Sequence, residues 1–130
     1  MIVVLDTFYY FPDPRAAVAA ILRLLRPGGL TVIEVPAAGT RLLRVGHNPD
    51  RLDLFYYSAG ALTRLLHEAG FTVESVIPLP ANHQRGLIRQ ALYSVYSAAA
   101  RVLFPLSRGQ IMLAPRFAVA ARKPGHLQSD

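Results

Sequence analysis

Two apolar runs near the start of the chain flank an amphipathic stretch. The first, Ile2–Leu5, is continuously apolar rather than alternating, which is typical of a parallel strand buried on both faces. The second, Leu30–Val35, has the same character. Pro36 follows it, and we expect the strand pairing to end there because proline lacks an N–H group. The pattern predicts two neighbouring strands of one sheet.

The stretch between the two runs predicts a helix with defined ends. Asp13 suits the N-cap, and Pro14 suits the first helical position, where no N–H group is needed. Apolar residues recur at helical spacing over the following turns, at Val18, Ile21, Leu22 and Leu25. Gly28 and Gly29 supply a left-handed stop for this helix. Strand, helix and strand in this order predict a right-handed crossover between parallel neighbours.

The rest of the chain continues with similar signals. A long loop, Ala37–Tyr57, comes first, and loops of this length inside compact domains are usually functional or mobile. Ser58 suits the N-cap of a second helix, which Gly70 ends. Phe71–Ile77 alternates apolar and polar residues, which is typical of a strand near a sheet edge. Phe117–Ala121 is predicted to be a last short strand.

A third helix is predicted over Leu87–Phe104, with apolar residues gathered on one side. Arg89 and Arg101 lie mostly elsewhere, and two charges within such a segment argue against a membrane span. We expect the apolar side to pack on the rest of the domain. The alternative is an amphipathic helix that lies on a membrane or on a partner.

Composition narrows the function classes. The 130 residues suffice for one domain with a real core, and the lack of cysteine excludes disulfides and thiolate metal sites. The formal net charge is +6, but thirteen of the fourteen basic residues are arginines scattered without a run, so we do not expect nucleic-acid binding. Met1 is followed by strand-like sequence with Asp6 rather than by a basic leader, which favours a cytoplasmic protein.

Four segments together resemble one known family. They are the strand end with Leu5–Thr7 and Phe11–Pro14, the turn and strand Leu24–Pro36, the helix and strand start Tyr56–Val73, and the last strand Pro115–Pro124. In this order they resemble the C-terminal half of class I S-adenosylmethionine-dependent methyltransferases that act on small molecules.

This resemblance implies an α/β, Rossmann-like half-domain. Its sheet is mostly parallel and four-stranded, and the last strand lies antiparallel between the second and third. Residues 1–124 then form the half-domain, with 81–114 as a helical insert, and 125–130 form a frayed tail.

Two departures from the family pattern bear on activity. The Gly-rich turn after a first strand and the acidic residue ending a second, which hold the cofactor in this family, are both missing from the sequence. Tyr9 and Tyr10 also stand where many relatives carry Glu-His. The resemblance therefore implies part of a methyltransferase that is inactive alone. The alternatives are a degenerate non-catalytic binding or dimerisation module, and a truncated product with no role of its own.

The candidate cofactor site lies at the carboxyl ends of the first strands, where ligands bind in open α/β sheets. The resemblance places Leu5, Asp6 and Thr7 beside the methionine part of S-adenosylmethionine. The alternative is that Asp6 and Thr7 only satisfy the strand end. Tyr10 is expected nearest the pocket, where its ring can stabilise a cationic centre. We expect at least two of the four aromatic residues from Phe8 to Phe11 to be buried in the core.

The candidate acceptor site involves the loop Ala37–Tyr57, which covers the small-molecule acceptor in relatives. His47 is a candidate general base, the alternative being an ordinary solvated histidine. Tyr9, Tyr56 and Tyr57 are candidate contacts to the acceptor. No spacing of histidines suggests a metal site, so none is predicted.

The strand Ile2–Leu5 also predicts an association surface. In the family this strand is central, but nothing in this sequence covers one of its sides. An unprotected apolar edge is a template for pairing with another chain. We therefore expect self-association or a partner chain at this edge.

Overall fold

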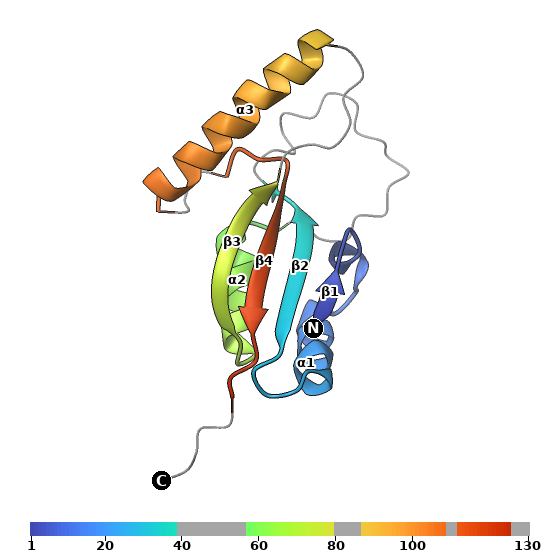
Figure 1. The fold of residues 1–130 in the computed structure, drawn as a ribbon. Helices are drawn as coiled ribbons and strands as arrows, with labels where there is room; N and C mark the ends of the chain where they lie inside the picture. Colours follow the sequence, from blue (N-terminus) through green and yellow to red (C-terminus); the bar gives the residue numbers. More distant parts are fainter. Residues whose placement is uncertain (39–56, 80–86, 109–111, 126–130) are drawn as a thin grey trace.

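The computed structural model describes residues 1–38, 57–79, 87–108 and 112–125. Its elements, in chain order, are β1 (Ile2–Val4), the short 3₁₀ helix η1 (Phe8–Tyr10), α1 (Pro14–Leu24), β2 (Leu30–Pro36), α2 (Ala59–Glu68), β3 (Thr72–Leu79), α3 (Leu87–Leu106) and β4 (Arg116–Arg122), as drawn in Figure 1. The four predicted strands are confirmed, with bounds that differ by one or two residues. Of the predicted tail, 125–130, residues 126–130 lie outside the described residues.

The four strands form one sheet in the order β1-β2-β4-β3. β1 pairs with β2 in parallel, and β4 is antiparallel to both β2 and β3. The prediction that the last strand lies antiparallel between the second and third is therefore confirmed, as is the edge position of β3. The strand ends at Pro36 as predicted, and Pro36 forms the last pair of the β2–β4 register, opposite Arg116.

The helix ends follow the predicted capping chemistry. The Asp13 side chain accepts a hydrogen bond from the Ala16 backbone N–H at 3.0 Å, and Pro14 is the first residue of α1. The Ser58 hydroxyl accepts from the Ala61 N–H at 3.1 Å, at the start of α2. Each cap satisfies an N–H group that has no partner within its helix.

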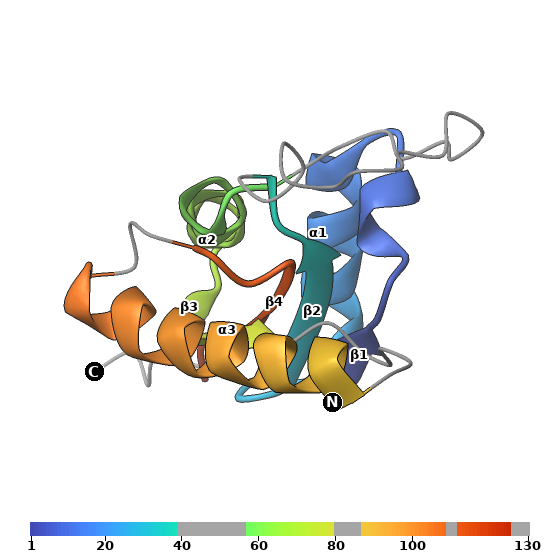
Figure 2. The same cartoon turned by 90° about the horizontal axis from the view of Figure 1, so that it is seen from above.

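The core lies between the sheet and two of the helices. Figure 2 shows α1 and α2 on one side of the sheet and α3 on the other. Buried residues from β2, β4, α1 and α2 form one cluster, which includes Ile33, Val35, Phe117, Val18 and Leu62. The end of β4 is tied to α1, because the Lys123 ammonium donates to the Leu22 and Leu25 carbonyl oxygens. That contact satisfies carbonyls at the helix C-terminus.

Two burial predictions were wrong. β1 was expected to be buried on both faces, yet Val3 is 46% exposed while Ile2 and Val4 pack against the core, so the described residues cover only one face of β1. The apolar side of α3 was expected to pack on the domain. Instead α3 contacts the body through another side that includes Ala100, and its long aliphatic residues face outward.

Candidate functional site

The chain turns sharply where β1 ends. Asp6 has a φ of 52°, in the left-handed region that residues other than glycine seldom adopt. The Thr7 hydroxyl donates a hydrogen bond to the Leu5 carbonyl oxygen, and η1 begins at the next residue. This turn presents the backbone of Leu5–Thr7 at the carboxyl end of β1. The three residues predicted to contact the cofactor therefore form one continuous turn.

A small charge network surrounds the Asp6 carboxylate. Its Oδ1 atom accepts a hydrogen bond from the Tyr9 hydroxyl at 2.6 Å and lies 2.7 Å from Arg116 Nη2. Arg116 Nε lies 2.8 Å from Glu34 Oε1. The network thus joins the ends of β1 and β2 to the start of β4 and to η1. The network contains two carboxylates and one guanidinium, so its net charge is −1.

Sequence reasoning missed two members of this network, Glu34 and Arg116. They are 82 positions apart in the sequence, and neither belongs to a recognisable motif. The predicted topology could have brought them together, because an antiparallel last strand beside the second strand must begin where the second strand ends. In the structure Glu34 lies opposite Ala118, two positions from Arg116, in the β2–β4 ladder.

The aromatic residues after β1 divide between the core and the surface. Phe8 and Tyr9 are fully buried, whereas Tyr10 and Phe11 are more than one-third exposed, which confirms that the core claims at least two of the four. Burial and then the hydrogen bond to Asp6 raise the pKa of the Tyr9 phenol far above its ordinary value. Tyr9 is therefore a protonated donor to Asp6 at neutral pH.

The remaining site residues lie nearby or outside the described chain. The Tyr10 ring is 4.4 Å from the Tyr9 ring, measured between centroids, and is partly open to solvent. Tyr57 is buried against Phe8, with 5.5 Å between ring centroids, and forms a bridge with Ala37 at the end of β2. Burial raises the pKa of the Tyr57 phenol. His47 and Tyr56 lie outside the described residues, so their roles stay predictions.

The structure brings Tyr9, Tyr10 and the Leu5–Thr7 turn together at one end of the sheet. Tyr57 joins them through Phe8. Among the described residues, no group of three or more His, Asp or Glu side chains could hold a metal ion. The arrangement offers a turn of backbone polar groups, a net negative charge and an aromatic surface. Such a surface suits a cationic organic ligand.

The Tyr9 hydrogen bond gives a direct test of this network. Tyr9→Phe should lower the free energy of unfolding by about 1 kcal/mol, because the part-buried hydrogen bond to Asp6 is lost while the ring still fills its site. Urea unfolding followed by circular dichroism measures the change. Thr72→Val is the control, and it should leave stability unchanged because it removes an exposed hydroxyl from β3, away from this network. Equal stabilities for both variants and the unmodified chain would contradict the network.

Comparison with known proteins adds the following findings. Residues 1–76, more than half of the chain, match the family model described as a methyltransferase domain. No curated protein matches the chain. Several solved structures share its fold.

Three of these structures illustrate the likeness. The [4+2]-cyclase SpnF is 22% identical with a TM-score of 0.57, over 95% of this chain and 50% of that chain. An S-adenosylmethionine-dependent methyltransferase from Thermotoga maritima is 13% identical with a TM-score of 0.56, over 93% of this chain and 54% of that chain. A Haemonchus contortus phosphoethanolamine N-methyltransferase in complex with S-adenosyl-L-methionine is 18% identical with a TM-score of 0.51, over 94% of this chain and 32% of that chain. The chain thus spans about half the length of the first two and about a third of the last.

Proposed function

Because this chain belongs to the methyltransferase domain family, we propose that it is the C-terminal half of an S-adenosylmethionine-dependent methyltransferase that acts on a small molecule. Two findings support the proposal: the chain spans only part of its structural neighbours, and one neighbour was solved with S-adenosyl-L-methionine bound. The observation that carries it is the Asp6 turn, held by Tyr9 and Arg116 at the carboxyl end of β1. We propose the cytoplasm as its location.

The residues present fit one end of this cofactor. The Leu5–Thr7 turn offers backbone polar groups, and the network of Asp6, Glu34 and Arg116 has a net charge of −1 that favours a cationic group. The cofactor supplies a methyl group activated on a positively charged sulfur. Its adenosine end needs the Gly-rich turn and the acidic residue that this sequence lacks. We infer that the chain alone binds the cofactor weakly and is not a competent enzyme.

On the acceptor side, we propose that Tyr10 contacts the reacting region and that His47 acts as general base. Tyr10 is the exposed tyrosine of the described site, and its ring can face a cationic centre. Tyr9 and Tyr57 contribute to the aromatic wall behind it, and Tyr56 is proposed to contact the acceptor.

A titration followed by nuclear magnetic resonance tests the cofactor site, because this method detects and locates weak binding. Adding S-adenosylmethionine to the ¹⁵N-labelled chain should shift the amide signals of Leu5, Asp6 and Thr7, with a Kd above roughly 100 µM. Glu34→Gln removes one negative charge of the network and should weaken binding further. Adenosine triphosphate, which shares the adenosine group but carries negative charge, should not shift these signals.

Two outcomes of this titration would contradict the proposal. Micromolar affinity for the isolated chain would show that this half is sufficient for cofactor binding. Unchanged signals at Leu5–Thr7 with millimolar cofactor would mean that the turn is not a cofactor site.

A second candidate function is a degenerate binding or dimerisation module without catalysis. The exposed edge favours it: Val3 of β1 and Leu5 just after it are 46% and 55% exposed. Such a module would associate through β1 and show no response of the Leu5–Thr7 amides to the cofactor.

A further inference from the structure

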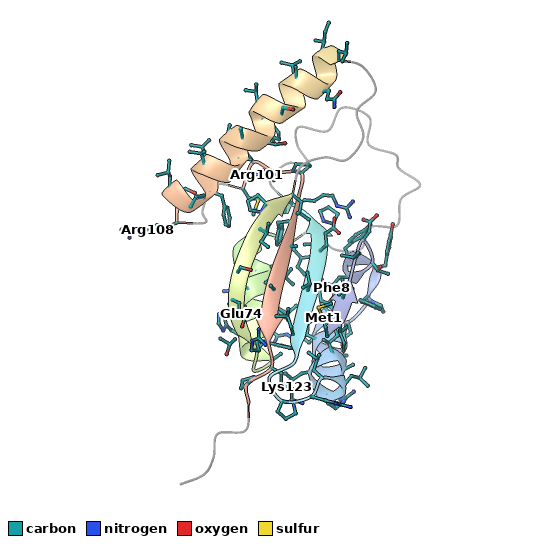
Figure 3. All side chains as sticks on the ribbon, in the orientation of Figure 1. Met1, Phe8, Glu74, Arg101, Arg108 and Lys123 are labelled. Carbon is teal, nitrogen blue, oxygen red and sulfur yellow. The ribbon has the colours of Figure 1, made fainter. Side chains whose placement is uncertain are left out.

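The outward side of α3 is an exposed apolar stripe. Its members are aliphatic residues with 37% to 86% of their surface exposed: Leu87, Ile88, Leu92, Val95, Val102, Leu103 and Leu106. At 100° per residue they fall within an arc of about 160° of the helix. Figure 3 shows side chains projecting from α3 along its length, on the side away from the strands. The stripe is continuous over the 20 residues of the helix.

This stripe is not the side by which α3 contacts the domain. Tyr96, Ser97 and Ala100 lie against Pro78 and Leu79 at the end of β3. Ala100 is only 2% exposed. The helix is therefore attached through one side while its most apolar side faces outward. Exposed apolar surface of this extent usually serves as an interaction site.

The charge around α3 indicates what this stripe contacts. Between β3 and β4, over residues 80–114, the sequence holds four basic residues and no acidic one. Arg101 lies about 120° around the helix from the middle of the stripe, at the pocket between α3 and the end of β3, and it is exposed to solvent. Arg108 follows the end of the helix. Long basic side chains beside an apolar stripe can extend to anionic head groups while their stems stay against apolar surface.

We propose that α3 lies in the plane of an anionic bilayer surface and buries this stripe among the lipids. No helix of the described chain is long and apolar enough to cross a membrane, so the contact is made along the surface. A second copy fits less well, because pairing two α3 helices would bring basic flanks together without a carboxylate between them.

Vesicle flotation with the full 130-residue chain tests this proposal. The chain should float with vesicles of phosphatidylcholine containing about one-third phosphatidylglycerol, and less with phosphatidylcholine alone. Leu92→Gln should lower the partition coefficient about tenfold, because one large side chain no longer enters the apolar layer. Leu24→Gln is the matched control, since Leu24 is an exposed helical leucine on the other side of the sheet, and it should leave binding unchanged.

The charge contribution is measured with Arg101→Gln. It should reduce binding to the anionic vesicles about fivefold and leave the weak binding to phosphatidylcholine unchanged. Circular dichroism checks that each variant keeps its helix content, so that loss of binding is not loss of fold.

Three results would overturn the proposal. The first is that the chain fails to float with anionic vesicles. The second is that Leu92→Gln and Leu24→Gln bind equally well, which would mean attraction by net charge alone. The third is that the chain forms a dimer that Leu92→Gln dissociates, which would make a second copy the occupant of the stripe.

Discussion

Replacing Phe117 with alanine is expected to destabilise the isolated chain severely, by about 3–5 kcal/mol. Phe117 is fully buried at the start of β4, opposite Val35 of β2 and Pro78 of β3. Truncating a buried phenylalanine costs about 3–5 kcal/mol, through lost burial and the cavity that remains. The total stability of a small domain is about 5–15 kcal/mol, and this one exposes an edge strand and an apolar helix face. The loss should therefore consume most of its stability.

Thermal unfolding followed by circular dichroism measures this effect. Ile77→Ala is the matched control, because Ile77 lies on the neighbouring strand β3 but is 48% exposed. It should cost less than about 1 kcal/mol. A Phe117→Ala variant with a cooperative transition close to that of the unmodified chain would show that β4 is not central to the core.

Short sequence patterns were enough to predict most of the helices and strands. Asp13 followed by Pro14, and Ser58 before an apolar stripe, predicted the starts of α1 and α2 because capping depends on residues within one turn. The alternation of Phe71–Ile77 predicted an edge strand, which β3 is. The place of β4 between β2 and β3 could not be read from periodicity. It came from the family resemblance, since strand order is a property of the whole sheet.

The candidate site was predicted only in part, for a physical reason. The rule that ligands bind at the carboxyl ends of parallel strands pointed to Leu5–Tyr10, and the family resemblance then singled out Leu5–Thr7. The left-handed conformation of Asp6 and its pairing with Arg116 depend on contacts between residues 110 positions apart. No local pattern reports such a contact.

The predictions of burial for β1 and α3 were wrong for a related reason. Periodicity shows that one side of α3 is apolar, but it does not show whether another element covers that side. The continuous apolar run Ile2–Leu5 likewise indicated a strand buried on both faces, while the described sheet leaves β1 at its edge. In both cases the local pattern shows that a segment could pack against apolar surface. Whether it does so depends on the other elements of the fold. These two surfaces are therefore where the chain is expected to bind something else.

The edge of β1 leads to the second large effect, self-association of the purified chain. One side of β1 pairs with β2, and no described strand pairs with its other side. Val3 is half-exposed on one face of the strand, and the strand contains no Lys or Pro that would oppose pairing. Sedimentation at concentrations on the order of tens of micromolar should show dimers or larger species. Val3→Lys should weaken association at least about tenfold, because pairing would bury or juxtapose the new charges.

The matched control uses the other edge of the same sheet. Ile77→Lys adds the same charge to β3, at a residue of similar exposure, and should leave association unchanged if β1 is the interface. Leu92→Gln should also leave it unchanged, which separates pairing at β1 from any contact through α3. An unmodified chain that stays a soluble monomer at these concentrations would mean that β1 does not pair with another chain. If Ile77→Lys disrupts association and Val3→Lys does not, the interface lies at β3, where the alternating strand presents fewer apolar residues to a partner.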